Sequence, residues 1–584
     1  MIFSMNPSFQ LLRRVLRKGK PYIPVFLLLG GVGLVKVPLE LYALLLSRKL
    51  IDQGFLQQSW DTIKQTLLFF ILVFILRSLI SYGTNLISTG VQLRMNKDFQ
   101  SELFSHIIHL PMRFFTKEPT GQLMSRVLDD ANRFSTIFNQ LFSRAIFDPL
   151  KLLVLFSLIA YFNLHLCTLM VISALISFLV IRWTGRKFHL YSKKIQKKTA
   201  ALYSFVQQIL SNMELIKAKT TEKSTAANFH DRTDQLVQLM LKPLRTSLFE
   251  QPLLEFFAYL ALGTVFIYGS WMISKDLLTL GTLTAFLGAT YLFFNTLNSL
   301  GRTYGLLRET LARMEILFSI LDSPPESSAD SSCQCHKIPS PISSVEFDHV
   351  SFGYTPSTPA LKYVSFQVPH GCTFGIMGQS GSGKTTLVRL LSRFYEPDEG
   401  EIKLNGQSIH HFDLTSLRSS IGIVFQENLI LNDTIKNNIA YGMDQISMEK
   451  IIEAAEISLS HDFIQSLPHQ YETIVGEAGR CLSGGERQRL SIARAMIADP
   501  EILILDEGTS FLEVEQETAI LQKIREARKG RITIIISHRL SAMRTADKIL
   551  TLDNGRLLEI ECEALEGIGK DRWKGLYDRI GTHH

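Results

Sequence analysis

Cysteine and charged residues are both scarce in this chain. Its 584 residues contain 6 cysteines, and charged residues make up 20% of the sequence against 46% hydrophobic residues. The cysteines lie at positions 167, 333, 335, 372, 481 and 562, a distribution that does not form a disulfide framework. The net charge of +7 comes from basic clusters that lack the interleaved aromatic residues of nucleic-acid surfaces. These features argue against a disulfide-stabilised secreted domain and against a nucleic acid as partner.

The stretch from Asp322 to Ser344 lacks hydrophobic periodicity and is polar and rich in proline. This composition is typical of a linker, and 584 residues are too many for a single core. We therefore predict two domains, residues 1–321 and 345–584, joined by a linker at 322–344. The string Cys333-Gln334-Cys335-His336 suggests a metal site, but no second ligand pair accompanies it, so we assign it to the linker.

Long apolar runs are crowded into the first domain. The run from Phe69 to Leu76, for example, is too apolar for an amphipathic surface helix. Because a spanning helix needs about 20 mostly apolar residues, we predict six spans, with the third and fourth joined as a tight hairpin near Asn163. The basic N-terminus resembles the start of a signal peptide, but no clear A-x-A site follows, so we expect the first span to be retained. The six spans are residues 22–46, 64–90, 141–162, 164–183, 252–273 and 281–302.

The basic residues outside the spans indicate the orientation. They gather at the N-terminus, between spans two and three, and between spans four and five, whereas Arg48, Lys49 and Lys275 lie on the opposite side. Because cytoplasmic loops are enriched in Lys and Arg, we predict a multi-pass protein of the cell (inner) membrane with both termini in the cytoplasm. The residues behind this prediction are Arg13, Arg14, Arg17, Lys18, Lys20, Arg94, Lys97, Arg113, Lys117, Arg126, Arg182, Arg186, Lys187, Lys193, Lys194, Lys197 and Lys198.

The second domain contains a phosphate-binding loop at residues 378–386. It follows a buried-strand pattern, Phe374 to Met377, and it precedes a helical pattern, as such a loop requires. Glycines let backbone N–H groups converge on phosphates at a helix N-terminus. Lys384 would neutralise the β- and γ-phosphates, and the Thr385 hydroxyl would bind Mg²⁺. The predicted ATP-binding residues here are Gly378, Gln379, Ser380, Gly381, Ser382, Gly383, Lys384, Thr385 and Thr386.

About a hundred residues later comes Leu482-Ser483-Gly484-Gly485-Glu486. Together with the phosphate loop, this LSGGE string resembles the ABC (ATP-binding-cassette) family of ATPases over the whole second domain. In that family the LSGGE of one subunit faces the phosphate loop of another. The resemblance therefore implies a dimer in which Ser483, Gly484 and Gly485 contact the ATP of the partner. Because this single chain keeps a complete catalytic set, we expect a homodimer.

The same resemblance implies roles for further residues. Tyr354, after the strand pattern Val345 to Phe352, would stack on adenine, although a lone tyrosine there is also typical of a core. Gln426 would contact Mg²⁺ and the attacking water, and Asp506 would hold Mg²⁺. Glu507 would act as general base on that water, and His538 would bridge Glu507 and the γ-phosphate.

One loop departs from the family pattern. Where the family has Ser-Ala-Leu-Asp after the catalytic glutamate, this chain has Ser510-Phe511-Leu512-Glu513, and Gly508 replaces the usual alanine. The bulkier Phe511 and the longer Glu513 alter a loop expected at the dimer contact. Neither change removes a catalytic group, so we expect reduced coupling at most.

The first domain resembles ABC exporters of the six-span half-transporter type. Its two cytoplasmic connections have helical patterning and would be inward extensions of the spans. The segment Phe114 to Arg126 resembles the first intracellular loop of that family, where a short coupling helix meets the ATPase; an ordinary turn is the alternative. In the second domain, Glu427 to Ile439 and Thr473 to Glu477 resemble an exporter's membrane-contacting region and its exporter-specific loop.

Charged residues within the spans are candidates for substrate contact, because they are costly there. Lys36 and Glu40 are four residues apart and would either pair with each other or bind substrate. Arg77 has no such local partner, and its sequence context resembles bacterial lipid A flippases, in which a cavity arginine meets lipid phosphates. The match is incomplete: Arg144 lies about a turn from the expected second arginine, and Asn298 stands where a lysine is expected.

The sequence thus predicts a multidomain protein with an all-α six-helix transmembrane domain followed by an α/β ATPase domain. The function implied is ATP-driven export or flipping of a hydrophobic or amphipathic, lipid A-like substrate, with ATP and Mg²⁺ as cofactors. Export of drugs or peptides is the alternative cargo, and an ATP-gated channel or sensor is a second class of function. Soluble ABC ATPases are excluded if the six spans are real.

Overall fold

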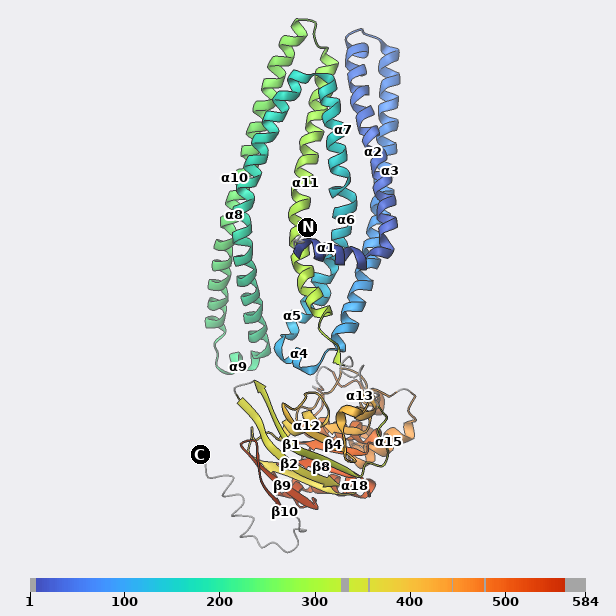
Figure 1. Cartoon of the computed structure of the whole chain (residues 1–584), viewed down its shortest axis with the longest axis vertical. Helices are drawn as coiled ribbons and strands as arrows, with labels where there is room; N and C mark the ends of the chain where they lie inside the picture. Colours follow the sequence, from blue (N-terminus) through green and yellow to red (C-terminus); the bar gives the residue numbers. More distant parts are fainter. Residues whose placement is uncertain are drawn as a thin grey trace, which may run out of the picture. The chain divides into compact units, whose positions relative to one another are not determined.

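The computed structural model describes residues 7–326, 336–355, 358–443, 445–476, 479 and 481–561. The chain divides into two compact units. The helical unit comprises Met1–Phe104 and Met124–Ile320, and the sheet unit comprises Ser105–Leu123 and Leu321–His584 (Figure 1). The segment Ser105–Leu123, between the second and third predicted spans, therefore belongs with the sheet unit.

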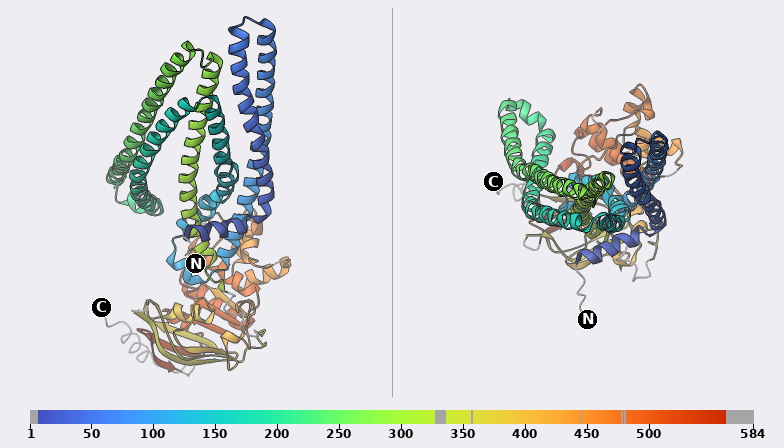
Figure 2. Two further views of the ribbon diagram at one scale, coloured as in Figure 1. Left: turned by 45° about the horizontal axis from the view of Figure 1, so that its top comes forward. Right: turned by 90° about the horizontal axis from the view of Figure 1, so that it is seen from above.

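A helix covers each of the six predicted spans in the helical unit. The prediction of a tight turn near Asn163 is confirmed, because the Asn163 side chain accepts hydrogen bonds from the N–H groups of His165 and Leu166 and so caps the following helix. Figure 2 shows α8 and α10 side by side along their length, with α1 crossing the foot of the other helices. The helices are α1 Pro7–Lys18, α2 Ile23–Lys49, α3 Trp60–Ile108, α6 Phe134–Gln140, α7 Phe147–Phe162, α8 Leu164–Ser211, α10 Glu222–Ser274 and α11 Leu280–Leu321.

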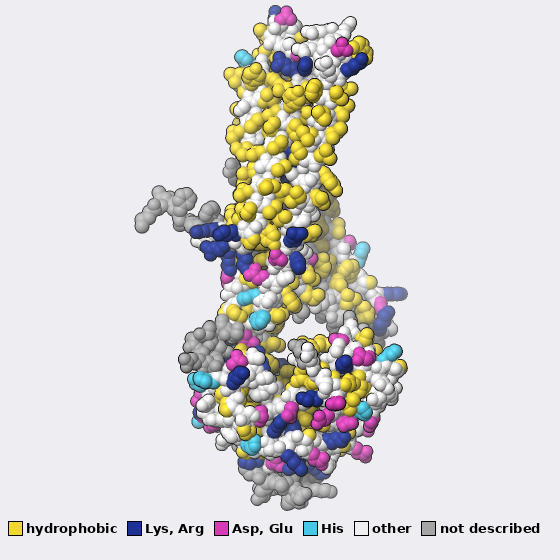
Figure 3. Space-filling model, turned by 90° about the vertical axis from the view of Figure 1, so that its right-hand side faces the viewer, with side chains coloured by type: hydrophobic (Ala, Val, Ile, Leu, Met, Phe, Trp, Pro, Cys, Tyr) yellow, Lys and Arg dark blue, Asp and Glu magenta, His cyan; other side chains and the backbone are white. Residues whose placement is uncertain are grey.

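Three stretches in the described residues are long and apolar enough to cross a membrane: Lys20–Phe55, Trp60–Ile108 and Leu280–Gly301. Large apolar side chains on them face outward, with Leu28 and Leu68 64% and 68% exposed. Figure 3 shows hydrophobic side chains covering the helical unit, with basic side chains at both ends of this band. An apolar exterior of this kind suits lipid and not water.

The other three predicted spans lie on α7, α8 and α10. Helix α7 has 16 residues and continues the π-helical turn Leu141–Ala145, while α8 and α10 contain the apolar stretches Leu164–Ser173 and Leu262–Ser274. Inside the unit, α2 approaches α7 closely at Gly30, where a Cβ atom would lie 2.0 Å from the Phe147 ring. A side chain at position 30 would therefore displace the Phe147 ring.

The sheet unit contains two β-sheets. The first is antiparallel, in the order β2-β1-β4-β5, and the second has the order β10-β9-β3-β8-β7-β6, with only the β10–β9 pair antiparallel. Their strands are β1 Ser344–Thr355, β2 Thr358–Pro369, β3 Thr373–Gly378, β4 Glu399–Leu404, β5 Gln407–Ser408, β6 Ile421–Val424, β7 Ile502–Asp506, β8 Ile532–Ile536, β9 Lys548–Asp553 and β10 Arg556–Glu561.

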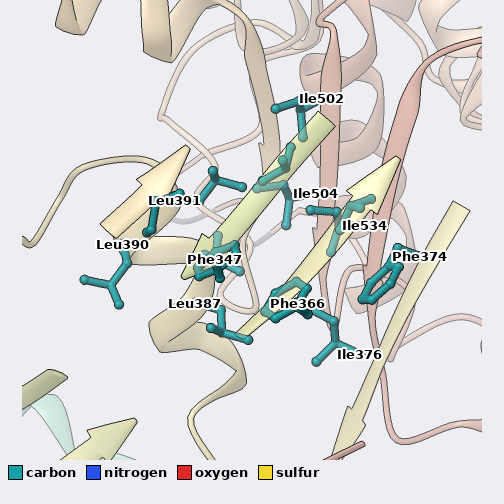
Figure 4. Packing of buried hydrophobic residues seen from close by; sticks show 14 of the residues in the cluster. Phe347, Phe366, Phe374, Ile376, Leu387, Leu390, Leu391, Ile502, Ile504 and Ile534 are labelled. Carbon is teal, nitrogen blue, oxygen red and sulfur yellow. The ribbon is translucent and has the colours of Figure 1, made fainter. Parts of the chain in front are cut away.

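Aromatic side chains join the two sheets. The ring of Phe366 stacks on Phe347 at 4.6 Å and on Phe374 at 5.6 Å, and all three are buried in one cluster (Figure 4). Helices complete the unit: α12 Lys384–Leu391, α13 Leu414–Ser419, α14 Ile435–Ile439, α15 Met448–Ile457, α16 His461–Ser466, α17 Gly484–Ile497, α18 Val514–Ala527 and α19 Leu540–Met543. The architecture is the predicted one, an all-α helical region followed by an α/β domain.

The parallel sheet determines where the functional residues lie. The phosphate loop follows β3, Glu507 follows β7, His538 follows β8 and Gln426 follows β6. Because the carboxyl ends of parallel strands meet at one edge, residues far apart in sequence are brought to one site.

Candidate functional site

The phosphate loop runs from the end of β3 into α12. Gly381 and Gly383 have φ angles of +79° and +106°, which side chains with a Cβ atom rarely adopt. A Cβ atom on Gly378 would lie 2.3 Å from the carbonyl oxygen of Leu552, whereas one on Gly381 would meet nothing within 4 Å. The loop is thus packed on its inner side and open at Gly381, next to the N-terminus of α12, where an anion is favoured.

Two buried charges define the inner wall of the site. The Lys384 ammonium donates to the carbonyl oxygens of Gly378 at 2.8 Å and Gln379 at 2.7 Å, and burial lowers its pKa. Asp506 is 1% exposed, and burial raises its pKa although the Thr385 hydroxyl hydrogen-bonds to it. A bound phosphate and a bound cation would offset these two burial costs.

These residues fit a magnesium–nucleotide complex. Among the described residues, the Asp506 Oδ1 and Ser382 Oγ atoms are buried without a hydrogen-bond partner. A carboxylate oxygen and a threonine hydroxyl are the oxygen ligands that Mg²⁺ prefers in nucleotide sites. The pair Asp506 and Thr385 can therefore hold Mg²⁺ against phosphates bound by the loop.

The structure brings the three predicted catalytic residues together. The Gln426 Nε2 atom donates to Glu507 Oε2 at 3.0 Å, and His538 Nδ1 lies 3.8 Å from Glu507 Oε1. The His538 side chain is 60% exposed, so it can reach a ligand above the carboxylate. Glu507 itself has φ +49°, a strained backbone conformation of the kind that persists at functional sites.

Tyr354 lies beside α12, and its aromatic ring packs edge-on to Phe352 and Tyr395. Its hydroxyl accepts a hydrogen bond from Arg389 at 3.1 Å and lies 3.3 Å from the Thr386 hydroxyl. The residue is 39% exposed. A tyrosine held by its edge and its hydroxyl keeps part of a ring face available for stacking.

The LSGGE string forms the start of α17. Ser483 and Glu486 make a capping box, in which the Ser483 side chain accepts from Glu486 N–H and the Glu486 carboxylate accepts from Ser483 N–H. Ser483 is exposed. A Cβ atom on Gly484 would lie 3.4 Å from the Phe511 ring, so the string borders the loop that departs from the family pattern.

Sequence reasoning missed Gln488, which lies on α17 and is fully buried. Its Nε2 atom donates to the carbonyl oxygen of Glu507 at 3.0 Å, and its Oε1 accepts from Phe511 N–H at 2.9 Å. One side chain thus joins the LSGGE helix to the backbone of Glu507. The only sequence signal was a glutamine where a core-facing helix position is expected.

The loop Gly508–Glu513 is held by two further residues that the sequence did not single out. Arg539 donates to the carbonyl oxygens of Ser510 at 2.6 Å and Leu512 at 2.8 Å. Fully buried Glu517 accepts from the Thr509 hydroxyl at 2.6 Å and from Ser541. The loop is fixed through its backbone and Thr509, and the Glu513 side chain makes no capping hydrogen bond to α18.

Of the two alternatives for Lys36 and Glu40, a pair with each other or a substrate role, the pair does not form in the structure. The Lys36 ammonium instead donates to the hydroxyl of Thr84 at 3.0 Å. Glu40 pairs with Arg77 of α3 at 3.0 Å and with Lys151 of α7 at 2.5 Å. Two cations on neighbouring helices outcompete a lysine on the same helix, because a charge away from water needs close partners.

A polar cavity of about 350 Å³ lies in the helical unit beside these charges. Lys36 and Arg144 line it, so the structure brings Lys36 to a cavity that also contains Glu40 and Lys151. Asn298 and Arg77 do not line this cavity. Arg77 nevertheless donates a hydrogen bond to Glu40, which does line it.

The segments predicted to connect the membrane domain with the ATPase domain are partly helical. Helices α4 Met112–Lys117 and α5 Thr120–Ser125 form the connection between the second and third predicted spans, and α4 lies within the sheet unit. Residues Glu427–Ile439 end in α14, whose Thr434 cap pairs with Ile474. Glu477, Cys333 and Cys335 lie outside the described residues. Within the part of the chain that is described, no cluster of three or more metal-binding side chains occurs.

Comparisons with known proteins match both units. Residues 29–297 match the ABC transporter transmembrane region, and residues 361–510 match the ABC transporter domain. The chain is 32% identical over 557 residues to the ATP-dependent lipid A-core flippase of Syntrophus aciditrophicus, covering 95% of this chain and 92% of that relative. It is 31% identical over 536 residues to the protein of the same description in Escherichia coli (strain K12), covering 91% of each. Among solved structures, a bacterial Atm1-family ABC exporter with ATP bound superposes with a TM-score of 0.80 at 28% identity, covering 96% of this chain and 100% of that one.

Proposed function

Since this chain belongs to the ABC transporter family, we propose that it flips a lipid A-like amphipathic lipid from the cytoplasmic leaflet outward. It is a multi-pass membrane protein of the exporter type, and it couples ATP hydrolysis to transport. The observation that carries the proposal is the polar, basic cavity inside the apolar helical unit. A lipid with an anionic headgroup and acyl chains matches a cavity of that kind.

The nucleotide site supplies the energy through residues of one edge of the parallel sheet. Tyr354 would stack on adenine, while the N–H groups of Gly378–Thr386 and the Lys384 ammonium hold the phosphates. Thr385, Gln426 and Asp506 would hold Mg²⁺, which supplies neutralisation of phosphate charge when bound. Glu507 would take the proton of the attacking water, and Gln426 would orient the Glu507 carboxylate through their 3.0 Å hydrogen bond. His538 would contact the γ-phosphate.

The working form in this proposal is a homodimer in the inner membrane, with both termini in the cytoplasm. Ser483, Gly484 and Gly485 would contact the ATP of the partner, which suits the exposed Ser483 at the N-terminus of α17. Each dimer then has two composite sites, and each chain supplies the phosphate loop of one and the LSGGE of the other. Basic residues near the helix ends support the orientation.

Cargo binding is assigned to Arg77 and Lys36 in the helical unit. A guanidinium at reduced dielectric suits phosphate because it donates two parallel hydrogen bonds. Lys36 lines the cavity. In the described residues its hydrogen bonds go to two neutral hydroxyl groups, at 3.0 Å to Thr84 and 3.5 Å to Ser81. An anionic headgroup would therefore find one cation without a carboxylate already bonded to it.

The test is ATPase stimulation in liposomes by lipid A-like phospholipids, compared with panels of drugs and peptides. The proposal requires the phosphorylated lipids to stimulate hydrolysis at lower concentration than either panel. Stimulation only by drugs or peptides would replace the lipid by that cargo. Hydrolysis that responds to no cargo, together with passive conductance gated by ATP, would favour a channel.

A further inference from the structure

Glu40 is a carboxylate within a predicted span and is 12% exposed. Its Oε1 atom lies 3.0 Å from Arg77 Nη2, and its Oε2 atom lies 2.5 Å from Lys151 Nζ. The three side chains come from α2, α3 and α7, so one carboxylate bridges three helices. A single negative charge therefore serves two cations at reduced dielectric.

The cavity next to Glu40 has more cations than carboxylates. Lys36, Arg144 and Lys151 line it together with Glu40 and Asp148. The rest of the polar lining is neutral and includes Thr84, Asn85, Ser88 and Gln92. Glu40 and Lys151 line the cavity, whereas Arg77 contacts Glu40 from outside the lining. An anionic group that enters the cavity therefore has to replace Glu40 to pair with both cations.

We propose that Glu40 is a built-in counter-ion that competes with the cargo's headgroup for Arg77 and Lys151, and so selects phosphate monoesters over weaker anions. This inference rests on the proposed function, since it concerns the headgroup of the transported lipid. A phosphate monoester carries about −1.5 to −2 charges and three terminal oxygens, enough to bond both cations at once. A phosphodiester has a single charge, like Glu40 itself, and gains little by displacing it.

The selection follows from competition for the same two cations. Without cargo, Glu40 pairs with Arg77 and Lys151 and reduces the cost of keeping them away from water, although one positive charge stays unbalanced. With a phosphate monoester, Arg77 and Lys151 gain a stronger partner, and Glu40 is released from both cations. With a neutral or singly charged headgroup the exchange is not favourable, and the Glu40 pairs remain.

The experiment compares the wild type with Glu40→Gln, which keeps the size of the side chain and removes its charge. The full chain is reconstituted in phosphatidylcholine vesicles containing increasing phosphatidic acid, a phosphate monoester, or phosphatidylglycerol, a phosphodiester. The readout is the lipid fraction that gives half-maximal ATPase stimulation. For Glu40→Gln we expect this fraction to fall about tenfold for phosphatidylglycerol, the size of one charge-assisted hydrogen bond. We expect a smaller fall for phosphatidic acid, so the preference for the monoester is lost.

Glu102→Gln is the matched control, because Glu102 pairs with Lys18 and is not among the cavity-lining residues. Its preference for phosphatidic acid should equal that of the wild type. An unchanged preference in Glu40→Gln would overturn the inference while leaving the cargo proposal in place. A wild type that neither lipid stimulates would instead overturn the phosphate-bearing cargo and the counter-ion together.

A second variant keeps the test valid if Glu40→Gln does not fold. Glu40→Asp retains the charge, but its shorter side chain cannot reach both Arg77 and Lys151. It should lower the half-maximal phosphatidylglycerol fraction in the same direction, by about twofold to threefold, because one of the two ion pairs of Glu40 is weakened. A rise or no change in that fraction would contradict the competition.

Discussion

The two units of this protein arrange their charged residues in different ways. In the sheet unit, the reactive residues stand in short sequence strings at the ends of parallel strands, and each string places its own residues. In the helical unit, Glu40, Arg77 and Lys151 come from three separate helices, and no short string shows their contact. Spacing along the chain therefore identifies a site that is built by one turn or loop, whereas a site between helices depends on which helix faces meet.

The largest expected effect tests the sheet unit. Glu507→Gln should lower the ATP hydrolysis rate by roughly 10²- to 10⁴-fold, because it removes the proposed general base. Nucleotide should remain bound, since Lys384 and the phosphate loop are unchanged. Phosphate release and retention of labelled ATP measure the two effects. Substantial hydrolysis in this variant would refute the role assigned to Glu507. It would also contradict the view that short sequence strings identify the reactive residues of the sheet unit.

Gln488→Leu tests whether the sheet-unit site is as local as its strings suggest. The variant leaves the Glu507 carbonyl and the Phe511 N–H without their buried partner, at a cost of about 1–3 kcal/mol. If losing these hydrogen bonds displaces Glu507, we expect kcat to drop about tenfold or more while KM for ATP stays constant.

Ser491→Ala is the matched control on the same helix, because the Ser491 hydroxyl bonds only to the Arg487 carbonyl one turn earlier in the hydrogen bonds described. Its kinetics should equal those of the wild type. Equal loss in both variants, or a rise in KM without a change in kcat, would mean that Gln488 supports α17 in general and not Glu507.

Arg77→Ala tests the helical unit, where the effect should be smaller because several cations share the cargo. We expect the lipid concentration for half-maximal ATPase stimulation to rise about tenfold, through loss of a charge-assisted contact. Arg48→Ala, which loses an ion pair with Asp52 at 3.7 Å outside the cavity lining, is the control. Unchanged lipid stimulation in Arg77→Ala would remove this residue from the cargo site.

The smallest effect is expected for Glu513→Asp in the loop that departs from the family. Aspartate is a good helix N-cap, so α18 should gain up to about 1 kcal/mol of stability. ATPase activity should stay within about twofold, because Arg539 and Gln488 hold the loop through its backbone. Thermal unfolding and hydrolysis rates measure both. A tenfold change in hydrolysis would show that the side chain at 513 acts in the site.

Much of the site was predictable because its parts are local. The string Gly378–Thr386 specifies a strand, a turn with positive φ angles and a helix start, and the structure has all three. The same holds for the capping box at Ser483 and Glu486. Gln488, Glu517 and Arg539 could not be recognised in this way. Each acts on residues brought near by the sheet, and a buried polar side chain looks ordinary until its partners are known.

The helical unit gives the opposite result. Apolar length alone located a helix at every predicted span, since backbone hydrogen bonds in lipid must be satisfied within the helix. Position along α2 left two alternatives for Lys36 and Glu40, a substrate role or a pair with each other, since residues four apart share a helix face. In place of that pair, the structure has bonds from Glu40 to Arg77 and Lys151, whose approach depends on how α3 and α7 pack against α2.

The two-part architecture, the nucleotide loop and the apolar helices could be predicted from the amino-acid sequence, because each depends on neighbours within a few turns of chain. Tertiary structure alone decided that Gln488 joins α17 to Glu507 and that Glu40 faces two cations beside a polar cavity. The physical reason is the same in both cases. A buried hydrogen bond or ion pair requires its partner within about 3 Å, and only the packing of separate elements brings distant residues that close.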